Sequence, residues 1–260
     1  MGEFSHIIDG MTWSFSRIEA FEQCPYEWVS RYIYGEDQRR LFFSDFGSFM
    51  HDILCRYFRN ELAEESLADT YLLEFSEKVS GNAPSFQIIS SRFEDGYSYL
   101  RSPFSTRVDL KNREILGVEQ EFVLSLDGIP FTGVVDLVTS DNGELVVTDH
   151  KSTVIKPPSG RKKPTLYDQD RNKRARQLYL YALAVKEKYG QWPSRLEFNC
   201  FRVPEIVSIP FDEKAKDEAI RWVPEVTQKI SDCERFSPNV DYFYCKNLCH
   251  LKECPYRDLL

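Results

Sequence analysis

The chain has 260 residues, which fits one domain with an elaborated core. Hydrophobic residues make up 42% of the sequence, so a globally disordered chain is excluded. The net charge of −8 is unusual for a protein that binds nucleic acid, but a local basic segment can still carry such a surface. No run of about 18 apolar residues and no signal-peptide pattern occurs, so we expect a cytoplasmic protein without a membrane span.

The N-terminal part of the chain, residues 1–110, is predicted to be mainly helical. Apolar residues recur at helical spacing in residues 12–34 and again in residues 44–60, so each stretch predicts a helix. Residues 61–100 have the same character, with a break near Gly81–Pro84. This portion contains no glycine-rich phosphate loop.

The pattern then changes to the alternation of a β-sheet. Three segments rich in β-formers, 114–126, 129–140 and 144–152, are separated by turn signals at Asp127–Gly128 and Asp141–Asn142–Gly143. Consecutive strands joined by tight turns predict an antiparallel meander.

The rest of the chain alternates between helical and extended patterns. We predict a polar loop at 156–171, a helix at 172–189, a strand at 195–202, a short strand near 205–210 and a helix at 212–231. The fold class is therefore α/β, a central mixed sheet with flanking helices. We expect a single domain, residues 1–260, made of a mainly helical portion (1–110), a core (111–210) and a C-terminal helix with a cysteine cluster (211–260).

Two carboxylates and a lysine are predicted to meet on this sheet. Asp149 and Lys151 are two residues apart on one strand and so share a face. Hairpin pairing brings Asp136, which is flanked by valine and leucine, close to Asp149. Two neighbouring carboxylates in an apolar strand repel each other, and a bound Mg²⁺ or Mn²⁺ removes that cost. The alternative is a structural ion pair between one aspartate and Lys151.

The GVVD…VVTDHKS segment resembles the core of RecB-type and Cas4-type nucleases in the PD-(D/E)XK superfamily. Further segments match that family's motifs in the same order: SRIEAFEQCPYEW (Ser16–Trp28), GSFMH (Gly47–His51), VEQEF around Glu119, and QLYLY (Gln177–Tyr181). The resemblance implies a restriction-endonuclease-like fold. It also implies DNA cleavage that depends on Mg²⁺ or Mn²⁺.

The resemblance also assigns residues to the site. It implies that Asp136, Asp149, His51 and the backbone carbonyl of His150 hold the metal. It adds Glu119, Gln177 and Tyr181 to the catalytic group of Asp136, Asp149 and Lys151. The alternatives are that His51 and Tyr181 are packed core residues and that Glu119 is an ordinary exposed strand residue.

Three cysteines are clustered near the C-terminal end of the sequence. Cys245, Cys249 and Cys254 have C-x3-C-x4-C spacing, which indicates a soft metal. Cys24, which precedes Pro25, is the natural fourth ligand. This arrangement resembles the iron–sulfur staple of Cas4 and AddB nucleases, which implies a 4Fe–4S cluster, although the family usually separates the first two C-terminal cysteines by two residues. Zinc, unligated thiols, and His250 as a substitute ligand remain open.

A basic segment lies between the Asp149 strand and the Gln177 helix. Its cations are Lys156, Arg161, Lys162, Lys163, Arg171, Lys173, Arg174 and Arg176. They predict a track for DNA phosphates, and the alternative is a solvated loop. The chain has no G-x-x-x-x-G-K-[ST] motif, so movement along DNA would need a partner helicase.

We expect a DNA nuclease, an exonuclease on single-stranded ends that serves recombination, repair or CRISPR adaptation beside a helicase or a CRISPR integrase. Two rival functions stay open. One is a non-catalytic DNA-binding subunit, which the intact Asp136, Asp149 and Lys151 disfavour. The other is an iron–sulfur redox protein, which would not need buried carboxylates.

Overall fold

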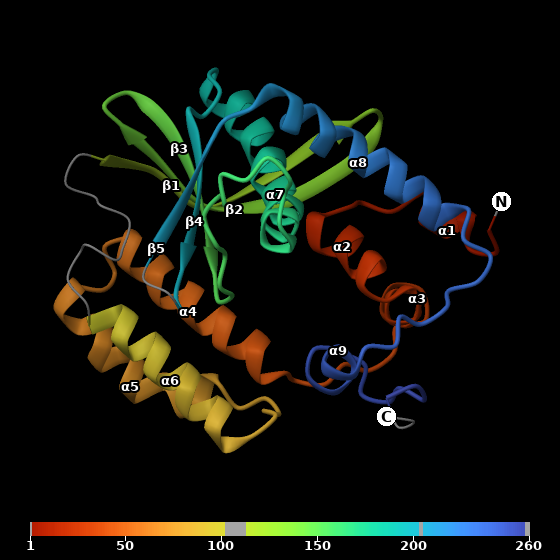
Figure 1. The fold of residues 1–260 in the computed structure, drawn as a ribbon, viewed down its shortest axis with the longest axis horizontal. Helices are drawn as coiled ribbons and strands as arrows, with labels where there is room; N and C mark the ends of the chain where they lie inside the picture. The colour runs from red at the N-terminus through yellow and green to blue at the C-terminus, as the bar shows by residue number, and fades with distance from the viewer. Residues whose placement is uncertain (1, 102–112, 203–204, 258–260) are drawn as a thin grey trace.

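Five strands form one mixed sheet in the order β1-β2-β3-β4-β5 (Figure 1). Their bounds are Arg113–Leu126, Ile129–Asp141, Glu144–Lys151, Arg195–Cys200 and Glu205–Pro210. The computed structural model describes residues 2–101, 113–202 and 205–257. The first three strands pair antiparallel, as predicted, while β3 pairs parallel with β4 and β4 antiparallel with β5. The predicted mixed sheet is confirmed.

The β2–β3 turn has the backbone that its sequence predicts. Asn142 and Gly143 both have positive φ, 53° and 89°, the conformation of a type I′ hairpin turn. Asparagine and glycine tolerate this region better than other residues. The tight turn fixes the register of β2 on β3 and therefore fixes which side chains of the two strands face each other.

A long helix connects the two parallel strands. α7 spans Leu166–Tyr189 and packs Leu178, Ala182 and Val185 on one face of the sheet. We predicted that this helix begins at 172. It begins six residues earlier because Thr165 and Asp168 form a capping box, each side chain accepting a hydrogen bond from the other's backbone N–H.

Three helices cover another part of the sheet (Figure 1). They are α4 (Phe42–Phe58), α5 (Leu67–Lys78) and α6 (Phe86–Arg101), with the short 3-10 helix η1 (Glu64–Ser66) before α5. Phe49 and Ile53 of α4 and Tyr71 of α5 form a hydrophobic core with Leu137 of β2 and with Phe201, which directly follows β4. The mainly helical N-terminal portion is confirmed for the described residues.

The remaining helices pack around the far end of the β1–β2 hairpin. They are α1 (Ser5–Ile8), α2 (Phe15–Gln23), α3 (Pro25–Tyr32) and α8 (Glu213–Ser231), and α9 (Tyr242–Asn247) follows near the C-terminus. Among the described helices, none combines the length and apolar composition needed to cross a bilayer.

The single helix predicted at 12–34 is wrong. Cys24 has extended backbone, with φ −156°, and ends α2 while its sulfur caps α3 by accepting from the Glu27 N–H. Pro25 follows as the first residue of α3, where its missing N–H costs nothing. The break turns the chain at Cys24 and brings α3 against the C-terminal segment.

Candidate active site

The two aspartates lie next to each other on neighbouring strands. Leu137 of β2 pairs with Thr148 of β3, and Asp136 and Asp149 are the next residues along these strands. β3 lies in the centre of the sheet, so Asp149 is only 1% exposed. The hairpin thus brings together the carboxylates that the sequence predicted to meet.

Lys151 is held between β3 and α7. Its ammonium lies 2.8 Å from Oδ2 of Asp149 and donates to Oε1 of Gln177 at 2.8 Å. The Gln177 amide donates to the hydroxyl of Tyr181 at 2.5 Å, one turn further along the helix. This chain of contacts fixes the position and direction of the ammonium.

Asp136 contacts the other side of the site. Its Oδ2 accepts from the N–H of His150 at 2.7 Å and lies 3.6 Å from Nδ1 of His51. The other ring nitrogen of His51, Nε2, lies 2.8 Å from the carbonyl oxygen of His150. α4 therefore places His51 beside both Asp136 and the His150 carbonyl.

Asp136 and Asp149 carry two negative charges when both are ionised, and the ammonium of Lys151 compensates one of them. Burial and the nearby Asp149 raise the pKa of Asp136 to about 6, although His51 lowers it. Oδ2 of Asp149 is buried, and apart from the ion-pair contact with Lys151 it accepts no hydrogen bond within the described part of the chain. Burial also raises the pKa of Tyr181 well above its usual range, and both aspartates add to that effect.

A divalent cation fits this donor set, because hard oxygen ligands with uncompensated charge suit Mg²⁺ or Mn²⁺. As the side chains lie, no three His, Cys, Asp or Glu groups among the described residues converge closely enough to enclose an ion. The candidate metal ligands therefore lie close to one another but do not surround a single point.

A family model of the PD-(D/E)XK nuclease superfamily matches residues 12–259 of the chain. The chain belongs to the PD-(D/E)XK nuclease superfamily. A solved structure of a candidate exonuclease from Eubacterium rectale is similar over 99% of this nuclease and 95% of that chain, with a TM-score of 0.51 and 13% identity. The structure named SSO0001 matches 92% of this chain and 82% of its own, with 16% identity and a TM-score of 0.35. No curated protein matches the chain.

Glu119 lies on β1 and makes its contacts toward α4. Glu119 lies opposite Asp136, between the paired residues on either side, but it has a positive φ of 47°. Its carboxylate accepts from the thiol of Cys55 at 3.2 Å and lies 3.7 Å from the guanidinium of Arg59. Cys55 is on α4 and Arg59 directly follows that helix, so the side chain of Glu119 is directed to its C-terminal end.

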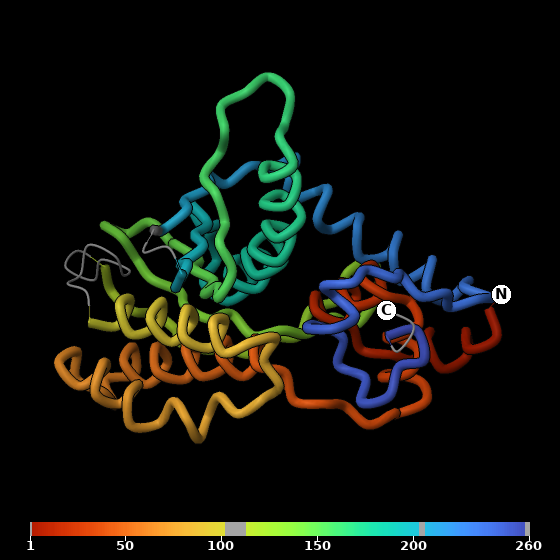
Figure 2. The backbone as a smooth tube through the Cα atoms, turned by 60° about the horizontal axis from the view of Figure 1, so that its bottom comes forward, coloured from red at the N-terminus to blue at the C-terminus, as the bar shows by residue number. Residues whose placement is uncertain are grey.

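The basic segment of the nuclease divides into exposed and buried cations. Arg161, Lys162 and Lys163 are exposed on the loop between β3 and α7, which projects from the molecule in Figure 2. Arg171 is buried, with NH1 2.9 Å from Asp168, so it is not available for the phosphate contact that we predicted. The helix start at Leu166 explains this, because it turns Arg171 inward.

The other predicted cations lie along α7. Lys173 is exposed, while Arg174 pairs with Asp170 at 3.0 Å and Arg176 lies 3.8 Å from Glu22. The ammonium of Lys156 lies 3.8 Å from the ring centre of Tyr167. Asp168 itself accepts hydrogen bonds from Ser159 and Thr165, which closes the base of the projecting loop.

Four buried cysteines lie where the N-terminal helices meet the C-terminal segment (Figure 1). They are Cys24, Cys245, Cys249 and Cys254, and no described cysteine forms a disulfide. Arg39, just before α4, donates to the carbonyl oxygens of Cys249, Cys245 and Lys246 at 2.8, 3.2 and 2.9 Å. These hydrogen bonds fix the backbone of the cysteine-bearing segment beside α3.

A buried carboxylate at this junction was missed by sequence reasoning. Glu27 is 1% exposed and accepts from the N–H of His250 at 3.0 Å and from the Tyr244 hydroxyl at 2.7 Å. Burial alone would raise its pKa, but the hydrogen bonds from His250 and Tyr244 lower it to about 2. The nitrogens of the His250 ring contact Glu27 and Ser44.

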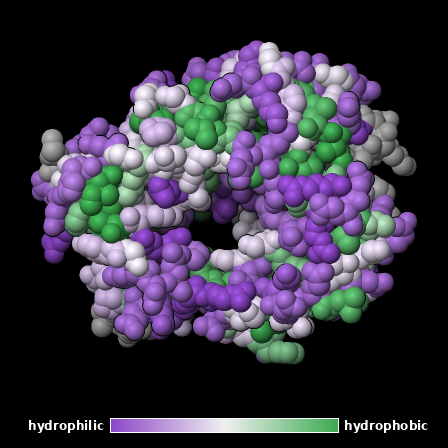
Figure 3. Space-filling model, turned by 180° about the vertical axis from the view of Figure 1, so that it is seen from behind, coloured by the Kyte–Doolittle hydropathy of each residue, from purple (hydrophilic) through white to green (hydrophobic). Residues whose placement is uncertain are grey.

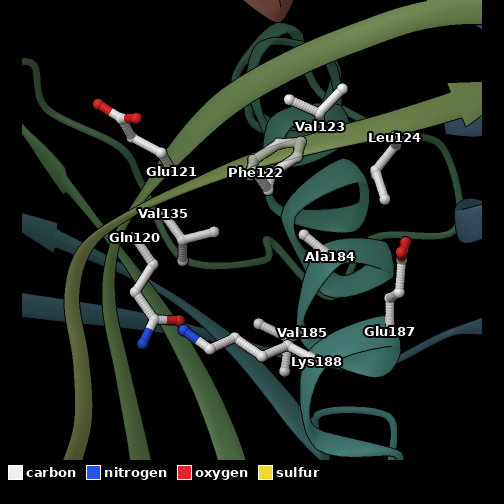
Figure 4. Close-up of a pocket in the computed structure, with 10 residues that line it drawn as sticks. All are labelled: Gln120, Glu121, Phe122, Val123, Leu124, Val135, Ala184, Val185, Glu187 and Lys188. Carbon is white, nitrogen blue, oxygen red and sulfur yellow. The ribbon is translucent and has the colours of Figure 1, made fainter.

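Two cavities lie between the β1–β2 hairpin and α7. One, of about 310 Å³, is lined by β1 and α7, with Val123, Leu124 and Lys188 at its rim (Figure 4). The other, of about 540 Å³, is lined by Asp136 and Gln177 and by residues of α2. Glu19 of α2 is a further acidic neighbour of Lys151, and burial raises its pKa against the influence of that lysine. Sequence reasoning found neither the cavity nor Glu19.

Proposed function

We propose that this protein is a DNA nuclease that uses Mg²⁺ or Mn²⁺ and acts on single-stranded ends. The observation that carries the proposal is the pair of neighbouring carboxylates, the partly buried Asp136 and the buried Asp149, beside which Gln177 and Asp149 hold the ammonium of Lys151. Burying charged groups at the centre of a sheet costs free energy, so their presence there indicates a functional site.

The metal would be held by Asp136 and Asp149, with His51 and the carbonyl oxygen of His150 at the same place. When bound, the cation supplies an activated water and neutralises charge on the phosphate. Lys151 then stabilises the negative charge that develops on the phosphate, since its ammonium is already oriented. Gln177 and Tyr181 would position Lys151, and Glu119 would add a carboxylate from β1, opposite Asp136.

The shape of the molecule supports a single strand as substrate. Figure 3 shows an opening through the middle of the molecule, and the corresponding region in Figure 1 lies between α4, α7 and α2. α4 and α7 carry His51 and Gln177. A flexible single strand can enter such an opening from its end more easily than a duplex can.

The exposed cations of the projecting loop would contact the phosphates of that strand. Arg161, Lys162 and Lys163 are consecutive and the closed base of the loop holds them together. Lys173, Arg174 and Arg176 extend the track along α7, and Arg171 does not belong to it. Since the chain has no P-loop motif, a partner helicase or a CRISPR integrase would deliver the strand.

The cysteines would hold a 4Fe–4S cluster, or zinc as the alternative. Sγ of Cys24 and Sγ of Cys245 both lie beside Asn239, since Cys245 donates to the Asn239 carbonyl at 4.0 Å and Cys24 accepts from the Asn239 backbone. Burial raises the pKa of Cys24, although backbone hydrogen bonds from Glu27 and Asn239 oppose this effect. Cys249 and Cys254 pack together with Leu251. Four free buried thiols from two distant parts of the chain suit a soft metal that joins them.

A cleavage assay tests the proposed function. Single and double strands labelled at the 5′ or the 3′ end are incubated with Mg²⁺, with Mn²⁺ or with EDTA. We expect labelled single strands to be shortened from an end with either metal, and EDTA to stop the reaction. Binding without any cleavage would instead support a non-catalytic DNA-binding subunit.

A further inference from the structure

The groove beside Asp136 has the size of a small-ligand site. Its volume is about 540 Å³, within the range of about 300–1,000 Å³ that is usual for such sites. Asp136 and Gln177 form its inner end, so it opens directly next to the proposed metal and lysine. A strand whose phosphate is at Asp136 therefore has one neighbouring nucleotide close to this groove.

The charge of the groove decides which part of a nucleotide fits. Its described lining contains the carboxylates Asp136 and Glu121 and no lysine or arginine. A phosphate would be repelled there, because no cation of the lining compensates its charge. A neutral base and sugar would not be repelled, and their amino and hydroxyl groups can donate to the exposed Glu121.

The walls suit a flat ring with polar edges. Phe15, Val134 and Tyr181 supply apolar surface, and Val134 is 40% exposed. Opposite Val134, the first residues of α2 supply the hydroxyls of Ser14 and Ser16, whose oxygens lie 3.2 Å apart. Nucleobases bind to proteins by such a combination of an apolar or aromatic face with hydrogen bonds at the edge.

We propose that this groove binds the base and sugar of the nucleotide on one side of the scissile phosphate. The inference rests on the proposed nuclease function and names the part of the substrate that the site recognises. In a duplex, that base is stacked and paired and cannot enter a groove without being extruded. The groove therefore discriminates against double-stranded DNA next to the cleaved bond.

The test uses short single strands in which the linkage next to the 5′ end, or the one next to the 3′ end, is a cleavable phosphodiester and all the others are phosphorothioates. An abasic residue replaces the nucleotide on one side of that bond or on the other. With the wild-type protein and Mg²⁺, we expect the loss of one base to lower kcat/KM by about tenfold and the loss of the other to have little effect. Equal effects on the two sides, or no effect on either, would overturn the proposal.

Variants fill the groove from opposite walls. Val134→Trp and Ser16→Trp should lower kcat/KM on the intact strand by about tenfold and should remove the sensitivity to the missing base, because the base is already displaced. Val123→Trp is the matched control, since Val123 is 72% exposed and lines the other cavity (Figure 4). If both groove variants fold and cleave like the control, the proposal is wrong.

A binding measurement separates this proposal from the proposed function. A single strand that carries 2-aminopurine is titrated with protein, with Ca²⁺ in place of Mg²⁺ so that the strand stays intact. A change of fluorescence with the wild-type and Val123→Trp proteins, lost with Val134→Trp, supports the groove even if no cleavage is ever observed. Cleavage by the wild-type protein together with identical fluorescence for all variants would overturn the groove alone.

Discussion

Asp136 is a mostly buried carboxylate and Glu27 a fully buried one, but their surroundings shift their pKa values in opposite directions. Burial and Asp149 raise the pKa of Asp136 to about 6, while hydrogen bonds from His250 and Tyr244 outweigh burial and lower that of Glu27 to about 2. Glu27 is satisfied by protein groups and joins two segments of the chain. Asp136 accepts from the His150 N–H but lies beside Asp149, whose buried Oδ2 accepts no hydrogen bond in the described part of the chain apart from its ion-pair contact with Lys151. This unbalanced pair marks a place where a further ligand is expected to bind.

The largest effect is expected from variants that remove the side chains proposed to act in cleavage. Asp149→Ala and Lys151→Ala should each lower cleavage by about a thousandfold or more, because the metal and the ammonium act as a unit. The rate is measured on a labelled single strand with Mg²⁺. Lys188→Ala is the control, since Lys188 is exposed and lines the other cavity. Undiminished cleavage by Asp149→Ala would refute the site.

The second test concerns the metal of the cysteine region. Purified protein should be brown, with iron and sulfide in near-equal amounts, and Cys24→Ala should lose both. Because one centre would join α3 to the C-terminal segment, that variant should become sensitive to protease at both ends together. Cys233→Ala is the control thiol. A colourless protein with stoichiometric zinc would refute the cluster, and full metal content in Cys24→Ala would refute its ligation.

Removal of the Glu27 carboxylate should destabilise the junction. Glu27→Gln leaves the surrounding donors without their charged acceptor, so we expect the free energy of unfolding to fall by about 3 kcal/mol. Denaturant unfolding measures this change, and limited proteolysis shows whether the segment after Asn239 is released first. Glu36→Gln, an exposed carboxylate, should have almost no effect. A neutral result for Glu27→Gln would mean that Arg39 and the thiols hold the segment without it.

Asp136→Asn should change the free energy of unfolding in the opposite direction and stabilise the protein. The folded pKa of about 6 lies above the ordinary value of 3.8, so the folded protein keeps a proton that the unfolded chain has lost between these pH values. Ionised Asp136 therefore destabilises the metal-free protein as the pH rises through this window. We expect the variant to be more stable by about 3 kcal/mol at pH 8 and unchanged near pH 4.

Urea unfolding at both pH values, without added divalent cation, measures this difference. Asp141→Asn serves as control, because the side-chain hydrogen bond from Arg195 lowers the pKa of Asp141 and its loss should destabilise the protein. If Asp136→Asn were destabilising at pH 8, the pair would be a structural feature like Glu27.

The smallest effect is expected at the projecting loop. Replacing Arg161, Lys162 and Lys163 by Ala should weaken binding of single-stranded DNA by about tenfold. It should also lower the slope of log affinity against log salt by about 2, since about three fewer counterions are released. Replacing Lys78, Lys214 and Lys229, exposed cations on other elements, changes the net charge equally and should leave the slope unchanged.

The sequence predicted the parts of the fold that depend on local patterns. Alternating apolar residues and the Asp127–Gly128 and Asn142–Gly143 signals fix the three-strand meander, and therefore the meeting of Asp136 with Asp149. Helix boundaries were harder to predict from the sequence. The start of α7 depends on Thr165 and Asp168, a capping box with aspartate at a position where glutamate is more usual.

Contacts between distant segments could not be predicted from one sequence. Glu27 appears as one acidic residue on an aromatic-rich helix, and only the packing of the C-terminal segment makes it a buried acceptor. Likewise, Arg171 is one of several cations, and its burial follows from its partner Asp168 rather than from its residue type. Family resemblance supplied the site roles of His51, Gln177 and Tyr181, and without it His51 and Tyr181 would be interpreted as packed core residues.

The outer position of β1 has a consequence for solubility. Within the described part of the chain, β1 is the first strand of the sheet and has one edge without a neighbouring strand, and Val123 on it is exposed. Side chains already donate to the carbonyl oxygens of Leu116 and Val118. The register shifts between Ile115 and Gly117, and Glu119 has a positive φ, so the edge is irregular. A second molecule could pair in regular register with only a short part of the strand, which lowers the tendency of the protein to aggregate edge to edge.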